Sequence, residues 1–409
     1  MVCSGEAAHP AVGYQGLAVV FVLSNFTCPP LEGQHANHVR LMQGLQALGF
    51  RVGMVTLVRR PELVDVDALQ RAVPGLVPLV VLPTRLNYPL LLLRHLLAWP
   101  VPTAPMAALL GSVAAAHPGA VLHLEGIGLL PLVRKLRGRA VVVTTTDAWS
   151  LRQRRLARRT PVSLRWLFLR AYAVLSAWAE RRYFPEAGAA QVVSPIDAAW
   201  LQQQVPAARV VSVPIALPSL SAAPAPAADG SAPIVLFWGD IRVAHIADGL
   251  RWLLTKVLPL VTSPVRWMVL GRGTPPAALQ ALGPHVDFVD WVDDIDQFLR
   301  KAAVVVLPDA DGTGLKNRAV HAMACGVPVV GTPPAFEGIP AVDGQHAMVR
   351  ATPQAFAAAV DQLLGHPAQA QQVAQAGQRF ALEGYSLNAV AAQWAALYGD
   401  VQRRASVVV

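Results

Sequence analysis

The chain has 409 residues, of which 54% are hydrophobic and 14% are charged, so it can bury two ordinary domain cores and does not have the composition of a disordered protein. Its formal net charge of +9 favours anionic ligands and anionic membrane surfaces. No nucleic-acid-binding motif accompanies this charge, so we expect no nucleic-acid partner. We also expect neither a signal peptide nor a spanning helix, because no run reaches the ~18 uninterrupted apolar residues that a membrane span needs.

Cysteine usage points to a reducing compartment. The chain has Cys3, Cys28 and Cys325, an odd number without C-x-x-C spacing. This pattern supports neither a disulfide framework nor a zinc site, so we expect free thiols in the cytoplasm. The adjacent Asp293 and Asp294 could imitate a metal site, but we interpret them as loop or helix-capping carboxylates and expect no metal.

The N-terminal half predicts a doubly wound domain over residues 16–217, preceded by a tail over 1–15. Apolar runs rich in β-formers are typical of buried parallel strands. They lie at Gly16–Leu23, Phe50–Val58, Leu79–Pro83, Ala120–Leu124, Ala140–Thr145, Gln191–Ser194 and Val210–Val213. The first is followed by a Pro- and Gly-containing loop and a helix through Gly49, so a ligand site is expected at that loop. No G-x-G-x-x-G follows the strand, which disfavours a nicotinamide dinucleotide.

Two segments of this half allow two interpretations each. Leu86–Pro102 is apolar and aromatic, and fits either a buried helix or a helix lying on a membrane. Leu151–Phe184 holds nine arginines interleaved with aromatic residues. It fits either a solvated helix with its aromatics facing the core or a basic amphipathic surface for an anionic bilayer.

A Pro/Ala/Ser-rich linker at residues 218–233 separates this half from a second domain at 234–384. The expected strands of this domain are Ile234–Trp238, Val265–Leu270, Val286–Trp291, Ala302–Leu307 and Val327–Gly331, and the expected helices include one that ends at Pro259, Pro353–Leu364 and Ala368–Glu383. A final amphipathic helix, Tyr385–Val401, lies in the segment 385–409.

The segment from Asp309 to Pro340 carries the clearest functional signal. A Gly-rich loop, Asp311–Gly314, leads into a helix expected over Lys316–Cys325. A helix N-terminus offers unpaired N–H groups and partial positive charge, which together favour an anion. Lys316 and Arg318 lie in the first turn, where cations disfavour the helix unless a phosphate neutralises them. The alternative is that both are solvated surface charges.

This segment resembles the donor-binding segment of the GT-B glycosyltransferases of family 4. The matching residues are Gly312, Gly314, Lys316, Asn317, Arg318, Ala322, Met323, Ala324, Gly326, Pro328, Val329, Val330, Thr332, Glu337 and Gly338. A weaker resemblance covers Pro29, Pro30, Gly33 and Leu45–Val52 in the first domain. The chain departs from the family at His321 and Thr313, where the family carries carboxylates, and at residues 214–216, where it lacks the usual P-N-G.

The resemblance implies an α/β fold of two Rossmann-like doubly wound domains facing a cleft, with a C-terminal helix crossing back to the first domain. It implies transfer of a hexose from a nucleotide diphosphate sugar to a polysaccharide or lipid-linked acceptor, with retention of configuration. No metal and no other cofactor is implied. The expected location is the cytoplasm, with peripheral attachment to the inner face of an anionic membrane as an open alternative.

The resemblance also implies the site residues. The donor-binding set is Gly33, Gly239, Gly271, Gly312, Thr313, Gly314, Leu315, Lys316, Asn317, Arg318, His321, Glu337 and Gly338. Lys316 and Arg242 are the catalytic candidates at the diphosphate. Asp147 is a candidate for acceptor contact or proton handling, and capping of the following helix is its alternative. His321 accepts one hydrogen bond where a carboxylate accepts two, which predicts lower donor affinity or a different base preference.

Two other functions compete with this interpretation. The altered positions are compatible with a non-catalytic scaffold or partner subunit in polysaccharide assembly. A sugar-nucleotide epimerase of the same fold is the second alternative, although no acid for proton chemistry at C2 of the sugar is evident.

Overall fold

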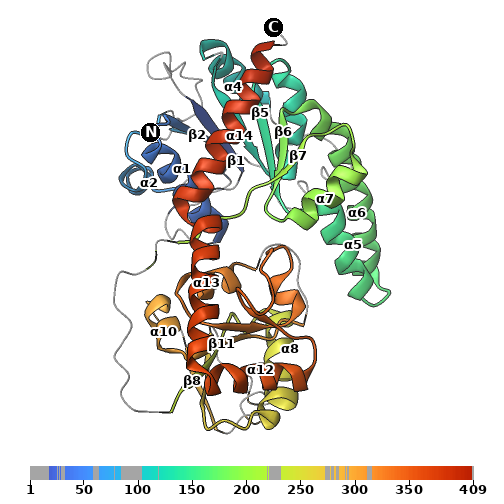
Figure 1. The fold of residues 1–409 in the computed structure, drawn as a ribbon. Helices are drawn as coiled ribbons and strands as arrows, with labels where there is room; N and C mark the ends of the chain where they lie inside the picture. Colours follow the sequence, from blue (N-terminus) through green and yellow to red (C-terminus); the bar gives the residue numbers. More distant parts are fainter. Residues whose placement is uncertain are drawn as a thin grey trace. The chain divides into compact units, whose positions relative to one another are not determined.

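A computed structural model describes the chain except for residues 1–17, 25, 27, 29–32, 59–63, 78, 84–103, 118, 219, 221–231, 272–276, 278–280, 282–284, 291, 293, 311–315 and 408–409. The chain forms two compact units (Figure 1). Unit 1 comprises Met1–Ala216 and Val390–Val409, and unit 2 comprises Leu217–Ala389. All of the apolar segment 86–102, and most of the expected linker 218–233, lie outside the described residues.

Unit 1 contains a parallel sheet in the order β3-β2-β1-β4-β5-β6-β7. The strands are β1 (Val19–Ser24), β2 (Val52–Val58), β3 (Leu79–Pro83), β4 (Val121–Glu125), β5 (Val141–Thr146), β6 (Ala189–Val192) and β7 (Val210–Ser212). All five residues of β4 are buried, as expected for a strand covered on both faces. Because such strands need apolar residues at every position, the continuous runs in the sequence predicted this sheet.

The helices of unit 1 connect these strands. They are α1 (Gly33–Ala47), α2 (Val66–Ala72), α4 (Ala104–Ala116), the 3-10 helices η2 (Ile127–Leu136) and η3 (Phe184–Glu186), α5 (Trp149–Arg159), α6 (Leu164–Tyr183) and α7 (Pro195–Gln204). Buried Leu110 and Val113 of α4 share a core with Leu122 and Leu124 of β4. The irregular η2, which the sequence analysis did not anticipate, adds Leu132 to the same core.

The arginine-rich segment forms two helices, α5 and α6, which lie side by side (Figure 1). The break falls at Thr160–Ser163, where Pro161 cannot donate a backbone hydrogen bond. Ser163 is the N-cap of α6 and its hydroxyl accepts a hydrogen bond from the Trp166 N–H at 3.2 Å. The segment is therefore a helical hairpin.

Unit 2 contains a second parallel sheet in the order β10-β9-β8-β11-β12-β13. Its strands are β8 (Ile234–Trp238), β9 (Arg266–Leu270), β10 (Val286–Val289), β11 (Val304–Leu307), β12 (Val329–Gly331) and β13 (Met348–Val349). Strand β13 was not predicted, because two residues are too short for an apolar pattern to be recognised.

The helices of unit 2 cover this sheet. They are α8 (Ala244–Trp252), the π-helix η4 (Leu253–Val257), the 3-10 helices η5 (Leu258–Leu260) and η6 (Pro333–Phe336), α10 (Ile295–Lys301), α11 (Asn317–Ala324), α12 (Pro353–Gly365) and α13 (Pro367–Tyr385). The predicted helix through Pro259 is present, but it is not α-helical throughout. The α-helix ends at Trp252 and continues as one π and one 3-10 turn, the latter with Pro259 near its start.

The last helix, α14 (Leu387–Val407), begins at the end of unit 2 and belongs to unit 1 from Val390 onward. This confirms the predicted C-terminal helix that returns to the first domain.

The doubly wound α/β class is also confirmed. In each sheet the strand order reverses at one place. Successive strands are added on one side of β1 until β3 and then on its other side from β4, and likewise around β8, with β11 on the other side. The carboxyl ends of the strands at such switch points are where open α/β sheets bind ligands.

Candidate functional site

The candidate site of unit 2 lies where β8 and β11 end. The loop residues Gly312, Thr313, Gly314 and Leu315 are outside the described residues. Lys316 follows them as the N-cap of α11 and is only 9% exposed. Asn317, the first helical residue, is exposed. The predicted lysine is therefore present at the N-terminus of the helix, and Lys316 is not a solvated surface charge.

Arg318 links the ends of the two central strands. Its Nη1 donates to the carbonyl oxygen of Trp238 at 2.5 Å, and its Nη2 pairs with the carboxylate of Asp309. The Arg318 side chain is 17% exposed and that of Asp309 is 2% exposed. The interpretation of Arg318 as a surface charge is therefore wrong. Its predicted contact with a diphosphate stays a prediction, and its observed role is to hold β8 and β11 together.

Two of the predicted glycines end neighbouring strands in tight surroundings. A Cβ on Gly239 would lie 2.6 Å from Arg318 Nη1, and a Cβ on Gly271 would collide with the carbonyl oxygen of Gly239. The Gly239 N–H donates to Leu270 at 3.0 Å, so the backbones after β8 and β9 are joined directly. At Gly271 the close approach of the Gly239 backbone leaves room only for glycine, whereas at Gly239 the neighbouring atoms belong to the side chains of Arg318 and Ile246.

The remaining donor-site candidates of unit 2 lie in the loop after β12. Thr332 Oγ1 donates to the carbonyl oxygen of Asp309 at 2.6 Å, which attaches this loop to the end of β11. Glu337 follows η6 and is half-buried, and Gly338 has a φ of 82°, a conformation that favours glycine. The structure therefore brings Thr332 to the same sheet edge as Asp309, with Glu337 a short loop further on.

Arg242 and Asp147 engage neighbouring side chains. Arg242 Nε and Nη2 donate to Asp240 at 2.8 and 2.6 Å. Asp147, in unit 1, lies 3.6 Å from Arg152 Nε. The alternative that Asp147 is the N-cap of the following helix was wrong, because the N-cap of α5 is Ala148. In the first turn of this helix the Ser150 N–H donates to the carboxylate of Glu180. Gly33, also in unit 1, is the first residue of α1.

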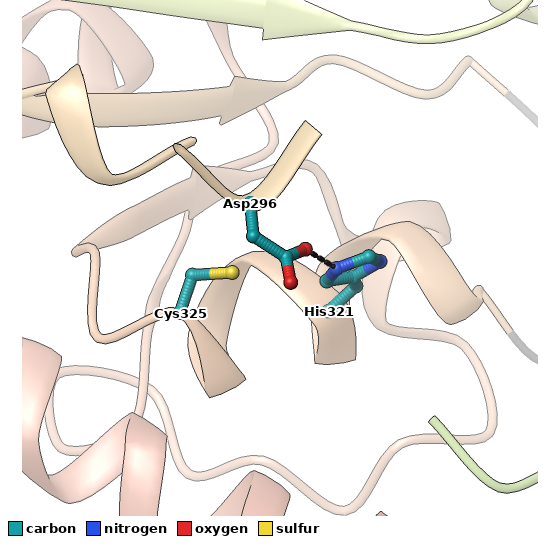
Figure 2. Close-up of side chains that lie close together, drawn as sticks. All are labelled: Asp296, His321 and Cys325. Carbon is teal, nitrogen blue, oxygen red and sulfur yellow. Dashed lines mark hydrogen bonds and ion pairs between the residues drawn. The ribbon is translucent and has the colours of Figure 1, made fainter. Parts of the chain in front are cut away.

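A buried group that the sequence analysis missed surrounds His321. His321 Nε2 lies 2.5 Å from Asp296 Oδ1, and both side chains are buried (Figure 2). Asp296 comes from the first turn of α10, 25 residues earlier in the chain. That helix is capped by Asp294, which accepts from the Gln297 N–H at 3.0 Å, so the interpretation of Asp294 as a capping carboxylate is confirmed. Asp293 lies outside the described residues.

Cys325 completes this group at the C-cap of α11 (Figure 2). Burial, together with the neighbouring Asp296, raises the pKa of its thiol to about 12. Within the part of the chain that the structure describes, Asp296, His321 and Cys325 form the one cluster with metal-ligand character, their ligand atoms lying within 4.8 Å of one another. These donor types suit zinc. The contacts nevertheless form a closed network in which Asp296 accepts from its neighbours, so the expectation of no metal stays a prediction.

Comparison with known proteins supports the fold of the chain and relates unit 2 to a known family. Residues 232–366 match the family described as "Glycosyl transferases group 1". No curated protein matches the chain by sequence. Sucrose-phosphate synthase from Thermosynechococcus elongatus is similar in structure with a TM-score of 0.65 at 18% identity, covering 95% of this chain and 100% of that chain.

Two further solved structures have the same arrangement over nearly the whole chain. A glycosyltransferase from Rickettsia africae gives a TM-score of 0.64 at 11% identity, covering 95% of this chain and 99% of that chain. HepE from Anabaena, in complex with UDP and glucose, gives a TM-score of 0.61 at 13% identity, covering 93% of this chain and 99% of that chain. At these identities the similarity establishes the fold. Residues 232–366 are thus similar to the group 1 glycosyltransferases, and the chain as a whole has the GT-B fold.

Proposed function

We propose that this chain transfers a hexose from a nucleotide diphosphate sugar to a polysaccharide or lipid-linked acceptor, with retention of configuration and without a metal ion. The donor would bind in unit 2. The observation that carries the proposal is the position of Lys316, whose cationic side chain lies at the N-terminus of α11 within the segment that matches the group 1 family. The similar HepE structures contain UDP and UDP-glucose, which supports this class of donor.

The chemistry required of such a site is neutralisation of the leaving diphosphate. The Lys316 ammonium and the N–H groups at the start of α11 supply positive charge there without a metal. Arg242 would add a second cation after exchanging its exposed pairing with Asp240 for the phosphate. Asp147 of unit 1 would contact the acceptor hydroxyl. Glu337 would hold sugar or ribose hydroxyls, and Gly312, Thr313, Gly314, Leu315 and Gly338 would shape the loops around the donor.

Nucleotide binding tests this proposal directly. Isothermal titration with UDP, GDP, ADP and TDP should detect at least one ligand, and Lys316→Ala should weaken its binding by roughly tenfold or more, as loss of a charge-assisted contact does. Lys256→Ala, which changes an exposed lysine of the same unit, is the matched control and should bind normally. Absence of binding by all four nucleotides would contradict the proposal.

A non-catalytic scaffold is the second candidate, and a specific observation favours it. His321 and Arg318 both direct polar atoms to protein partners, Asp296 and Asp309. A scaffold would retain the fold and release no nucleotide diphosphate from any donor. An epimerase of the same fold would exchange the proton at C2 of the sugar without an acceptor. A coupled assay for nucleotide release, run beside an isotope-exchange assay at C2, separates the three functions.

We further propose that the α5–α6 hairpin attaches the enzyme to the inner face of an anionic membrane. No helix in the described part of the chain is both long and apolar enough to span a bilayer. The turn between α5 and α6 instead exposes two apolar residues, Val162 at 86% and Leu164 at 88%. Leu167 and Val174 continue this exposed apolar surface along α6. Arg158, Arg159 and Arg165 flank the turn in sequence, a pattern that suits acidic lipid headgroups.

Flotation with vesicles that contain phosphatidylserine tests this attachment. The protein should float at low salt and less at high salt, because electrostatic attraction is screened. Val162→Asp/Leu164→Asp should abolish flotation, whereas Leu260→Asp, at an exposed leucine of unit 2, should not. Equal flotation of both variants would exclude the hairpin turn as the attachment surface. The aromatic residues of the hairpin contact one another, as Phe168 and Tyr172 do, so the double variant spares them.

A further inference from the structure

The amino edge of the unit 1 sheet, where β5, β6 and β7 begin, gathers arginines around two carboxylates. The first carboxylate is Glu186 of η3, which precedes β6. Its Oε1 accepts from Arg134 Nε at 3.0 Å and from Arg182 Nη1 at 2.8 Å. Its Oε2 accepts from Arg137 Nε at 3.2 Å and from Nη2 of the same residue at 3.1 Å. A carboxylate accepts about four hydrogen bonds, so these three arginines saturate Glu186.

The second carboxylate is Asp400 of α14. Its Oδ2 lies 2.6 Å from Arg209 Nη2 and accepts from Arg404 Nε at 3.0 Å. Arg403 Nη2 lies 3.6 Å from the other carboxylate oxygen, Oδ1. Arg209 is the residue directly before β7, so this second group of arginines also lies at the amino edge of the sheet.

The two groups are neighbours. The Gly188 N–H donates to the carbonyl oxygen of Val141 at 2.9 Å, and a Cβ on Gly188 would lie 2.5 Å from Val401 Cγ1. Glu186 is two residues before Gly188, and Asp400 is the residue before Val401. The backbone next to Glu186 therefore contacts the helix that carries Asp400, and the two groups form one surface. We call this surface the arginine edge, and its members are Arg134, Arg137, Arg182, Arg209, Arg403 and Arg404.

The arginine edge has more positive charge than the fold itself uses. Within the part of the chain that the structure describes, its six arginines form ion pairs only with Glu186 and Asp400, which leaves a surplus of four positive charges. The helices η2, α6 and α14 end here with basic residues in their last turns. Each helix C-terminus carries about −0.5 of an elementary charge, so the three offset about 1.5 positive charges. More than half of the surplus therefore remains.

The guanidinium groups of this surface are held in place and are still accessible. The side chains of Arg137 and Arg403 are 67% and 73% exposed. Partial burial raises the pKa of the Glu186 and Asp400 carboxyl groups, but the arginines lower it more, so both pKa values lie below the usual range and both groups stay ionised at neutral pH. A guanidinium has five N–H donors, of which each ion pair here uses one or two. The others can bind a further carboxylate in the bidentate manner.

The arginine edge lies opposite the carboxyl edge, where doubly wound sheets bind ligands. Strand β5 begins at the arginine edge with Val141 and ends at Thr146, directly before Asp147, the candidate for acceptor contact. Its six residues span about 20 Å. A partner bound at the arginine edge is therefore separated from that candidate by the length of a strand and does not compete with substrate for Asp147.

The surroundings of the arginine edge favour an acidic polypeptide over a bilayer. Trp178 of α6 is 43% exposed and lies one helical turn before Arg182. Arginine and tryptophan are enriched together at protein–protein interfaces. Val162 and Leu164, the exposed apolar residues of the α5–α6 turn, lie at the other end of α6, a helix of 20 residues and about 30 Å. The arginine edge is therefore a separate surface from the proposed membrane contact.

We propose that the arginine edge docks an acidic segment of a partner protein, in which aspartate or glutamate side chains lie next to an aromatic residue. The carboxylates of the segment bind the exposed guanidinium groups, Arg137 and Arg403 among them, and its aromatic residue packs against Trp178. Charge complementarity carries this assignment, because the surplus on the edge is positive and its most exposed members are arginines. The docking site does not depend on the proposed glycosyl transfer.

Fluorescence anisotropy of a labelled glutamate-rich peptide that contains one phenylalanine tests this surface. The peptide should bind the full-length protein at low salt and more weakly at high salt. Arg137→Gln/Arg403→Gln should weaken binding by roughly tenfold or more, because two charge-assisted contacts are lost. The matched control, Arg158→Gln/Arg165→Gln, removes the same charge from exposed positions at the α5–α6 turn and should bind like the unmodified protein. Equal weakening by the two double variants, or no binding at low salt, would overturn the proposal.

A change at Trp178 tests whether the partner is a polypeptide with an aromatic residue or any polyanion. Trp178→Ala should weaken binding of the phenylalanine-containing peptide by roughly 2- to 10-fold and leave binding of a glutamate-rich peptide without phenylalanine unchanged. Equal affinities of the variant and the unmodified protein for the phenylalanine-containing peptide would overturn the assignment to a mixed acidic and aromatic segment. Unchanged near-ultraviolet circular dichroism, apart from the signal of the lost tryptophan, confirms that the variant is folded.

Two further measurements examine other occupants of the arginine edge. Vesicles that contain phosphatidylserine should float Arg137→Gln/Arg403→Gln as well as the unmodified protein, and loss of flotation in this variant would make the edge a lipid-binding surface and overturn the proposal. Sedimentation velocity should give both proteins the same size. A larger species that is present only in the unmodified protein would make the occupant a second copy of the chain, which would also overturn it.

Discussion

His321 Nε2 lies 2.5 Å from Asp296 Oδ1, and both side chains are buried. The position at which family 4 glycosyltransferases carry a glutamate therefore holds an imidazole backed by a carboxylate from another helix. A carboxyl group is therefore present here, but it belongs to Asp296 of α10 and contacts the imidazole ring of His321. A substitution that looks drastic in the sequence is thus accompanied by a matching residue in the structure.

The pairing predicts that restoring the family residue alone is harmful. His321→Glu places a second carboxylate beside buried Asp296, and like charges at such a distance are strongly unfavourable. We expect a loss of about 3–5 kcal/mol in the free energy of unfolding, comparable to breaking a buried ion pair. His321→Glu/Asp296→Asn should recover much of this loss. Urea unfolding of the single and double variants measures the coupling, and additive effects would show that the two residues are independent.

Arg318 predicts a second stability effect. Arg318→Ala leaves the buried carboxylate of Asp309 without its cation and the carbonyl of Trp238 without a donor. The expected loss is about 3–5 kcal/mol. Arg242→Ala removes a pairing with Asp240 in which the arginine side chain is 60% exposed, so the loss there should stay below about 1 kcal/mol. Similar unfolding midpoints for the two variants would contradict the structural role of Arg318.

Glu180 predicts a dependence of stability on pH. Burial raises its pKa in the folded protein to about 7 from a usual value of 4.5, despite a hydrogen bond from the Ser150 N–H at 3.0 Å. Because folding favours the protonated form, Glu180 lowers the stability progressively as the pH rises from about 4.5 to about 7. Glu180→Gln should therefore stabilise the protein by about 1–3 kcal/mol at pH 8 and have little effect at pH 4. Thermal unfolding across this range checks the sign, and a larger gain at low pH would refute it.

Cys325 predicts chemical inertness. Its thiol is buried and its pKa is raised to about 12, so almost no thiolate forms at neutral pH. Iodoacetamide at pH 8 should leave Cys325 unmodified in the folded protein and alkylate it in urea. Mass spectrometry of the digested protein makes the comparison at this residue. Rapid alkylation of Cys325 in the native state would show that its surroundings open readily.

The cluster of Asp296, His321 and Cys325 also predicts that the protein binds no metal there. Elemental analysis of protein purified without chelators should find no stoichiometric zinc, and Co²⁺ should produce no thiolate charge-transfer absorption. The physical reason is that Asp296 and His321 already bond to each other and the Cys325 thiol is held protonated. Stoichiometric zinc that is lost in Cys325→Ser would overturn this expectation.

Most strands were predictable because a parallel strand in a covered sheet is apolar along its whole length. Ile234–Trp238 and Leu79–Pro83 were predicted with the bounds that the structure gives. Strand β13 and helix η2 were missed, since a two-residue strand and a 3-10 helix that contains Pro131 have no distinct periodicity. The sequence predicted where helices lie better than where α-helical geometry ends. The α-helix α8 ends at Trp252 and a π-helix follows, which the sequence did not predict.

By itself, the sequence determined the two doubly wound domains, the returning helix and the glycine loop that leads to Lys316. Each of these depends on residues close together in the chain, where periodicity, capping and loop composition act locally. Only the tertiary structure decided which side chains form hydrogen bonds with one another. Asp296 reaches His321 across 25 residues, Arg318 reaches Trp238 across 80, and His123 reaches Tyr398 across 275. Such hydrogen bonds depend on how the strands and helices pack, which no local pattern records.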